Sequence, residues 1–253
     1  MDVLGFSNMV RNSVAQNTMQ DVFEKFHGTF SDIARRLGGG KPDPQIGYAI
    51  DWVARVFSDN VVFGVPCQLL VGGLYLEMFD TVLSLISEAQ LSLALHGYFV
   101  RGAISEGQLF IDAEMVYGPA LLEAYDLERI VARHPRVILS NEIQQYVSDQ
   151  KYARSKDSLF PLGSPYLLQD SDGNTYLNYL EHILIGAGSD YVQWGNVDTH
   201  RVLIEERLTI HYNEPEYEKY LWLAQYHNAF CDDHADSEDY TPSYRIDEAM
   251  MIG

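Results

Sequence analysis

The ten residues "RVFSDNVVFG" at positions 55–64 decide how this chain begins to fold. Apolar and β-branched residues stand on both sides of Ser58, Asp59 and Asn60, and these three residue types are frequent in tight turns. The pattern therefore predicts two antiparallel strands joined by a short turn. Such a hairpin carries the Asp59 carboxylate at its tip, where it is either a simple turn residue or a group presented to a ligand.

Composition narrows the class of protein. With 253 residues, 47% of them apolar, the chain can form one large domain or a domain with an extension. The formal charge of −19 repels nucleic-acid phosphates and anionic lipids, so we expect neither a nucleic acid nor a membrane as partner. Cys67 and Cys231 are too few for a disulfide framework, and the N-terminus lacks a signal-peptide pattern, which predicts a cytoplasmic protein.

Hydrophobic periodicity predicts helices that alternate with strands. Helical spacing recurs from Ser7 to Leu37 and again from Leu74 to Leu93. In full, we predict a first strand that ends before Gly5, a helix at 7–37, strands at 47–58 and 61–65, a helix after Pro66, two strands within 97–113, a helix at 118–134 and a strand at 135–140. This order predicts an α+β palm, in which the helices lie over one face of a mainly antiparallel sheet.

The composition changes near residue 150. Residues 149–158 are polar and linker-like, residues 165–180 form a predicted hairpin, and two helical stretches follow. The stretch "DSDGN" at 170–174 begins like a calcium loop, but no Glu follows at the required distance, so we interpret it as the turn of that hairpin. We therefore predict a first domain at 1–148 and a C-terminal extension of hairpin and helices at 149–253.

Four short motifs carry a family resemblance. They are "DVLGFS" at 2–7, "FSDNVVF" at 57–63, "RGAISEG" at 101–107 and "GPALLEAYDLE" at 118–128. In this order, and on these elements, they resemble the motifs of class III nucleotidyl cyclase catalytic domains, over about residues 1–145. More narrowly, the chain is similar to the pyrimidine nucleotide cyclases of Pycsar anti-phage systems, which make cyclic UMP or cyclic CMP.

The resemblance implies a ferredoxin-like palm and a site for two divalent metal ions, Mn²⁺ or Mg²⁺. Asp2 and Asp59 would bridge the two metals, with the backbone carbonyl of Val3 as a further ligand. Two metals about 3.5–4 Å apart can activate an attacking hydroxyl and neutralise a leaving group. Such hard cations prefer oxygen ligands. Asp59 would then lie at the hairpin tip because the turn presents it to the metals.

The same resemblance implies where the nucleotide binds. Gly5, Phe6 and Ser7 would bend the chain close to the triphosphate, where the start of a helix favours anions and Ser7 can cap that helix. Arg101, on the neighbouring strand, either contacts phosphate or holds the edge of the sheet. The first strand of the family normally begins several residues earlier, so we expect the chain to start late, directly before Asp2.

The resemblance implies that Arg55 and Met115 stand at the positions that recognise the base of the nucleotide. Strand periodicity places Arg55 and Phe57 on one face with Asp59. Arginine only donates, which suits the carbonyl oxygens of a pyrimidine ring packed against Met115 and Phe57. The alternative is that Arg55 forms an ion pair with a surface acid. UTP is the first choice of substrate and CTP the second.

Two helix positions depart from the family pattern. Its transition-state Asn and Arg match Leu122 and Asp126, neither of which can donate to phosphate. Either another residue such as Arg101 stabilises the charge, or the domain is slow or inert. The expectation is a homodimer with its sites at the interface, making a second messenger for a separate effector. The alternative from a different class is an inert, cyclase-like domain that binds nucleotide or a partner.

Overall fold

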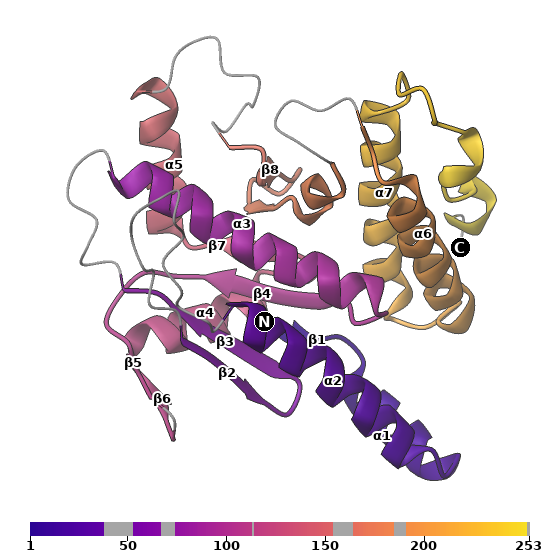
Figure 1. Ribbon diagram of the computed structural model, residues 1–253, viewed down its shortest axis with the longest axis horizontal. Coiled ribbons are helices and arrows are strands. Elements are labelled where there is room, and N and C mark those ends of the chain that lie inside the picture. The colour runs from indigo at the N-terminus through magenta and orange to yellow at the C-terminus, as the bar shows by residue number, and fades with distance from the viewer. Residues whose placement is uncertain (38–52, 67–73, 113, 154–163, 185–190, 252–253) are drawn as a thin grey trace.

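The computed structural model describes residues 1–37, 53–66, 74–112, 114–153, 164–184 and 191–251 (Figure 1). In chain order the elements are β1 (Asp2–Val3), α1 (Phe6–Ala15), α2 (Met19–Leu37), β2 (Val53–Phe57), β3 (Asn60–Gly64), α3 (Leu74–Leu95), β4 (Val100–Ile104), β5 (Phe110–Ile111), β6 (Val116–Tyr117), α4 (Pro119–Ile130), β7 (Val137–Leu139), α5 (Asn141–Ala153), β8 (Leu167–Gln169), β9 (Thr175–Leu177), the 3₁₀ turn η2 (Tyr179–Ile183), α6 (Trp194–Ile210), α7 (Tyr217–Asp233), and the 3₁₀ turns η3 (Pro242–Tyr244) and η4 (Glu248–Met251).

The core of the fold is a mixed seven-stranded sheet in the order β2-β3-β1-β4-β7-β9-β8. Strands β4 and β7 run parallel, and the other neighbouring pairs run antiparallel. Strands β5 and β6 form a separate two-stranded ribbon. The predicted α+β class is therefore confirmed. The short β1 lies near the centre of the sheet, paired with β3 on one side and β4 on the other.

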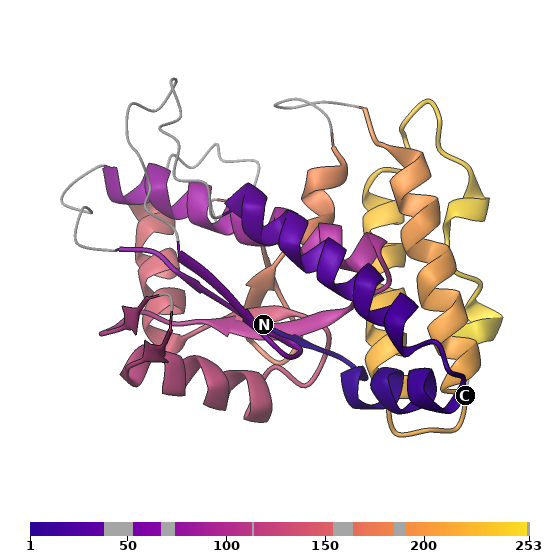
Figure 2. The ribbon, with the colours of Figure 1, turned by 60° about the horizontal axis from the view of Figure 1, so that its bottom comes forward.

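Helices cover both faces of this sheet. Helices α2 and α3 lie over one face, α4 lies against the opposite face, and α6 and α7 stand side by side beyond one end (Figures 1 and 2). The expectation that all helices share one face is therefore wrong for α4. Because the sheet is covered on both sides around β4 and β7, these strands are almost entirely apolar, and Val100, Val137, Ile138 and Leu139 are buried.

The first helix is broken where a continuous one was predicted. Asn17 adopts a left-handed backbone with φ of 57°, which asparagine tolerates better than most residues. Around it the Thr18 amide donates to the Ser13 carbonyl at 2.8 Å and the Asn17 amide to the Val14 carbonyl at 3.2 Å. These two bonds form a Schellman motif, which ends α1 and lets α2 start in a new direction.

Most predicted strands are present with shifted ends. The hairpin of β2 and β3 is confirmed, but only Ser58 and Asp59 form the turn, because Asn60 already pairs with Phe57. The earlier part of the strand predicted at 47–58 lies outside the described residues up to position 52. Strand β6, helix α5 and the 3₁₀ turns η2, η3 and η4 were not predicted. Helix α5 includes the segment 149–153, which was expected to be a linker.

The C-terminal segment continues the same sheet. Strand β9 pairs with β7 through Ile138 and Tyr176, and β8 pairs with β9 across the predicted hairpin turn. The predicted boundary between residues 148 and 149 falls inside α5, and the division into two folding units stays a prediction. Across the residues that the structure describes, each helix is too short or too polar to cross a membrane.

Candidate functional site

The sheet brings Asp2 and Asp59 together at its centre. Asp2 of β1 lies opposite Asn60 of β3, and the Val3 amide donates a hydrogen bond to the Asp59 carbonyl at 3.1 Å. Ser58 has a left-handed backbone with φ of 55°, which places Asp59 at the end of the β2–β3 hairpin. The two carboxyl groups are close enough to share a hydrogen bond.

Carboxylates and cations both surround Asp2, with Glu128 and Asp59 on one side of the balance and Arg101 and the Met1 ammonium on the other. Its pKa is raised to about 6, chiefly by burial and then by the negative charges of Glu128 and Asp59, while Arg101 acts in the opposite direction. A carboxyl group in such a position is stabilised either by a proton or by a cation. The arrangement therefore favours binding of a positively charged species between Asp2 and Asp59.

Arg101 lies between two carboxylates. Its Nε is 3.4 Å from the Asp2 Oδ2 atom and 2.5 Å from the Glu128 Oε1 atom, although Nε and Oε1 are not aligned as a hydrogen bond. Strand β4 is interior, flanked by β1 and β7, so the expectation that Arg101 holds a sheet edge is wrong. The sequence reasoning missed Glu128, which looked like a surface residue of α4 but is 7% exposed.

The bend after β1 has the predicted form, with different roles for its residues. Gly5 is the N-cap of α1 with φ of 73°, a backbone conformation that favours glycine. Ser7 is exposed inside the first turn and makes no capping hydrogen bond, so its predicted cap role is wrong. Phe6 packs on Phe26 with ring centroids 5.2 Å apart, so its side chain belongs to the core. Of the groups predicted to bind the triphosphate at this bend, only the backbone N–H groups at the start of α1 could still contact an anion.

The two predicted base-reading positions are neighbours. Arg55 donates through Nε to the Asp112 carbonyl and through Nη1 to the Ala54 carbonyl at 2.8 Å. The Asp112 carboxylate in turn accepts from the Met115 amide at 2.8 Å, so Asp112 links Arg55 to Met115. Among the described residues, the hydrogen bonds of Arg55 go to backbone carbonyls. The alternative prediction was an ion pair with a surface acid, and the charge of Arg55 does help to lower the pKa of the exposed Asp112 carboxyl, after the hydrogen bonds from the Glu114 and Met115 amides. The side chains of Phe57 and Met115 are 56% and 64% exposed.

The structure of α4 agrees with the sequence in placing no phosphate donor at the two positions that match the family's Asn and Arg. Leu122 is 66% exposed and Asp126 is exposed, and neither donates a hydrogen bond to phosphate. Tyr125 on the same helix is 55% exposed and stands 6.0 Å from the guanidinium of Arg129. The sequence prediction missed this phenol, because the family resemblance concerns only positions 122 and 126 of α4.

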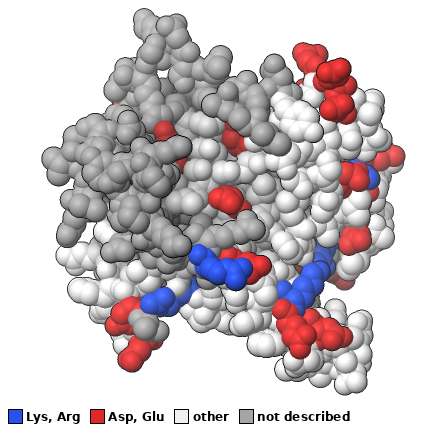
Figure 3. All heavy atoms as spheres, viewed as in Figure 1, with Lys and Arg blue, Asp and Glu red and all other residues white. Residues whose placement is uncertain are grey.

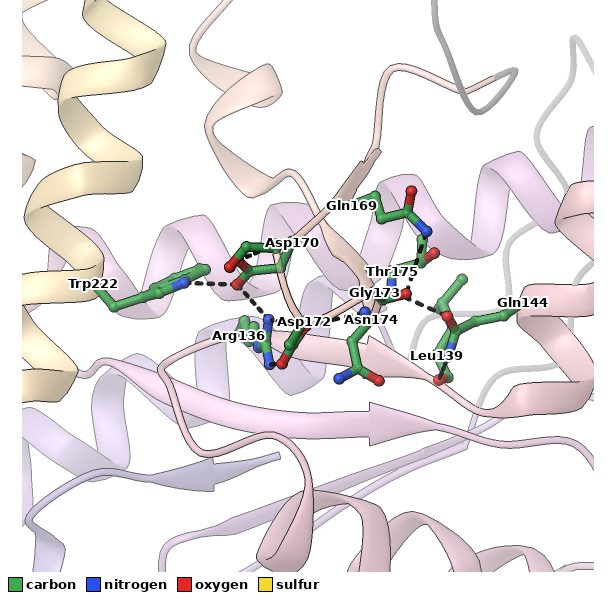
Figure 4. Close-up of polar contacts among 11 residues, drawn as sticks. Arg136, Leu139, Gln144, Gln169, Asp170, Asp172, Gly173, Asn174, Thr175 and Trp222 are labelled. Atoms are coloured by element: carbon green, nitrogen blue, oxygen red, sulfur yellow. Dashed lines mark hydrogen bonds and ion pairs between the residues drawn. The ribbon is translucent and has the colours of Figure 1, made fainter.

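A second polar cluster lies away from these residues and was not predicted (Figure 4). Arg136, at the start of β7 and 1% exposed, forms ion pairs with Asp170 and Asp172 in the turn between β8 and β9. The Trp222 indole of α7 donates to the Asp170 Oδ2 atom at 2.8 Å and lies against the guanidinium, which is 5.9 Å from the ring centre. Both carboxylates pair with the guanidinium, whose Nε alone is buried without a hydrogen-bond partner among the described residues, so the cluster joins β7, the hairpin and α7.

The carboxylates fit hard divalent cations by donor chemistry. Within the described part of the chain, no three His, Cys, Asp or Glu side chains are grouped to hold a metal ion. Asp2 and Asp59 provide two carboxylates, and the Val3 backbone carbonyl, next to Asp2 in the sequence, is a possible third oxygen ligand. Oxygen-only ligands of this kind suit Mg²⁺ or Mn²⁺. The pKa of Asp2, raised by burial and neighbouring carboxylates, agrees with a site that gains from a cation.

The face seen in Figure 3 offers no continuous basic surface among the residues described there, since its Lys and Arg side chains lie in small groups against Asp and Glu.

Comparisons of the chain with models of protein families, with curated proteins and with solved structures found no match.

Proposed function

We propose that this protein is a metal-dependent pyrimidine nucleotide cyclase that converts UTP to 3′,5′-cyclic UMP and diphosphate. CTP, giving cyclic CMP, is the second choice of substrate. The observation that supports this proposal most is the meeting of Asp2 and Asp59 at the centre of the sheet, with the pKa of Asp2 raised by burial and by neighbouring carboxylates. The resemblance of four motifs to class III cyclases supplies the reaction.

In the proposed reaction the ribose 3′-oxygen attacks the α-phosphorus. A new P–O bond forms, the bond to the β-phosphate oxygen breaks, diphosphate leaves and the hydroxyl proton passes to solvent. Two divalent metals would supply a lower pKa for the attacking hydroxyl and charge neutralisation on the triphosphate. Asp2, Asp59 and the Val3 carbonyl would hold them.

The remaining residues position the nucleotide. The chain bends at Gly5, and the backbone N–H groups at the N-terminus of α1 attract anions, so this helix end would bind the triphosphate. Arg101 forms ion pairs with Asp2 and Glu128, and its guanidinium would be available to stabilise the developing phosphate charge. Arg55 and Met115, joined through Asp112, would contact the pyrimidine ring, and Phe57 adds an exposed aromatic surface beside the hairpin tip.

The proposed enzyme is a homodimer with sites at the interface. Exposed apolar side chains gather on the ribbon of β5 and β6 and on the neighbouring α4, and they include Phe110, Met115, Tyr117, Leu122 and Tyr125, each more than half exposed. Large apolar side chains in this number on one region are typical of a surface that another molecule covers. A second copy of the chain would cover them and place its base-reading residues beside the metals of the first.

The finer assignments rest on the same resemblance. They are the ferredoxin-like palm, a cytoplasmic location, and a cyclic nucleotide that acts as second messenger for a separate effector in anti-phage defence. The inert cyclase-like domain remains the second candidate, favoured by Leu122 and Asp126 on α4, which place no hydrogen-bond donor for phosphate.

Incubation with each of the four ribonucleoside triphosphates and Mn²⁺, followed by mass spectrometry, separates the two candidates. The proposal expects a cyclic pyrimidine monophosphate and diphosphate in equal amounts. Nucleotide that binds and returns unchanged from all four incubations would identify the inert domain instead.

A further inference from the structure

Glu128 is a buried charge on an otherwise apolar side of helix α4. Ala120 and Ala124 precede it by two turns and by one turn on the same side of the helix, and Glu128 itself is 7% exposed. A carboxylate is costly to bury unless a positive charge pairs with it. The described cations that act on Glu128 are the Arg101 guanidinium and the Met1 ammonium. The role of this carboxylate therefore has to be sought among these neighbours.

Arg101 lies between Glu128 and the proposed metal ligand Asp2. Asp2 and Arg101 are directly opposite each other in the antiparallel pair of β1 and β4, so their side chains leave the sheet on the same face. Val3 and Val100, their neighbours in sequence, belong to the apolar cluster that includes α2 on the other face. The side chains of Asp2 and Arg101 therefore point to the face that α4 covers (Figure 2).

The Arg101 side chain is shared between these two carboxylates. Its Nε is 3.4 Å from the Asp2 Oδ2 atom and 2.5 Å from the Glu128 Oε1 atom, and the side chain is 24% exposed. Neither the Arg101 Nε nor the Glu128 Oε1 makes a hydrogen bond within the described part of the chain. The planar fork of a guanidinium pairs best with one carboxylate at a time. The observed position is therefore intermediate between a full pair with Asp2 and a full pair with Glu128.

We propose that Glu128 is a positioning residue that takes Arg101 away from Asp2 when a divalent cation binds. The cation would lie between Asp2 and Asp59 and repel the guanidinium of Arg101 at short range. Glu128 then offers the guanidinium a second, buried partner, which leaves the Asp2 carboxylate free for the cation. This exchange of partners rests on the metal site of the proposed function, but it needs only the cation and not the reaction.

Two other roles of Glu128 would also affect cation binding. Its carboxylate could attract the cation through its charge alone, or it could bind the cation directly. Both of these roles act without Arg101, whereas the proposed role acts only through Arg101. The Met1 ammonium also acts on Asp2 and Glu128, but it is the same in every variant compared. Removing Glu128 with and without Arg101 therefore separates the proposed role from the other two.

The test is a double-mutant cycle on the binding of Mn²⁺ alone, followed through the electron paramagnetic resonance signal of free Mn²⁺. Arg101→Met should tighten binding by about tenfold, because a positive charge beside Asp2 is removed. Glu128→Gln should weaken binding by about thirtyfold, of which about threefold comes from the lost charge and about tenfold from Arg101 closing on Asp2. In the Arg101→Met protein, Glu128→Gln should weaken binding by only about threefold.

Glu205→Gln is the matched control. It removes the carboxylate of a comparable ion pair on α6, in which the Arg201 Nη1 is 2.7 Å from the Glu205 Oε2 and the side chains are 21% and 23% exposed. Because α6 stands beyond one end of the sheet, this change should leave Mn²⁺ binding unaltered (Figures 1 and 2).

A second measurement follows Arg101 directly. In ¹⁵N-labelled protein, the Nε–H resonance of Arg101 is identified by its loss in Arg101→Met. Saturating Mg²⁺ should slow the exchange of this hydrogen with water by about tenfold or more in the wild type, because its bond to Glu128 forms. Glu128→Gln, whose amide has no charge to hold the guanidinium, should lose most of this slowing. If Glu128→Gln does not fold, the response of the wild type still decides.

Equal effects of Glu128→Gln with and without Arg101 would overturn the proposal, as would an Arg101 hydrogen whose exchange Mg²⁺ leaves unchanged. The absence of Mn²⁺ binding by the wild type would overturn the proposal together with the metal site. If the effects are coupled but no triphosphate is cyclised, the exchange of partners stands and the proposed function fails. If triphosphate is cyclised but the effects are independent, the proposed function stands and the role of Glu128 fails.

Discussion

Replacing Arg136 with methionine should destabilise the fold strongly. The guanidinium is 1% exposed and pairs with Asp170 and Asp172, whose side chains are 17% and 44% exposed. Removal of one partner from a buried ion pair costs about 3–5 kcal/mol, and partial hydration of the two carboxylates lowers this to about 2–4 kcal/mol. For a chain of 253 residues we expect the Tm to fall by roughly 5–15 °C.

Urea unfolding followed by circular dichroism measures the change at pH 7. Arg245→Met is the matched control, because its ion pair with Asp232 is more exposed and should be worth less than about 1 kcal/mol. Burial raises the pKa of Asp172, but hydrogen bonds from Arg136 and Asn174 outweigh it and hold the pKa below the ordinary 3.8. The contribution of Arg136 is therefore present at neutral pH and is lost as the pH falls below that value. A loss under 1 kcal/mol at pH 7 would refute this account of the cluster.

Three further predictions concern the nucleotide, the dimer and acid stability. Arg55→Ala should lower kcat/KM for the preferred pyrimidine triphosphate by about tenfold to a hundredfold, and unchanged kinetics would place Arg55 outside the site. Mixing Asp59→Ala chains with Arg55→Ala chains should restore about a quarter of wild-type turnover after subunit exchange. Random pairing makes about half of the dimers mixed, and each mixed dimer has one intact site of two. If no turnover is recovered, each site is built within a single chain. Burial lowers the pKa of His227 to about 4, so the contribution of His227 to the unfolding free energy should fall by about 3 kcal/mol between pH 6.5 and pH 4. His227→Gln should therefore lose less unfolding free energy over this pH range than the wild type, and an equal loss in the variant would contradict the prediction.

The sequence predicted what local patterns determine. The hairpin at Asp59 follows from alternating apolar residues around a turn, and the bend at Gly5 follows from a glycine between an apolar run and a helix. The break between α1 and α2 was not predictable in the same way, because Asn17 adopts a left-handed backbone inside an otherwise continuous helical pattern. Helix α5 was missed because its sequence is polar and does not separate clearly from the loop that follows.

Polar contacts between residues far apart in the chain could not be predicted from the sequence. Arg136 meets Asp172 from 36 positions away and shares Asp170 with Trp222, which lies 52 positions further along the chain, and no spacing rule connects them. Glu128 likewise reads as a surface residue of a helix until β4 brings Arg101 beside it. The meeting of Asp2 and Asp59 was expected only through the family resemblance, and the register of β1 against β3 supplies its physical cause.

The most direct test of the central claim compares wild-type protein with Asp59→Ala in UTP and CTP at saturating Mn²⁺. Asp59 lies at a turn and carries little core packing, so the variant should fold as the wild type does, which unfolding curves verify. The proposed two-metal site predicts that wild-type protein forms a cyclic pyrimidine nucleotide and that Asp59→Ala forms essentially none. A folded variant that keeps about a tenth or more of wild-type turnover would contradict the site, and Asp59 would then be a turn residue only.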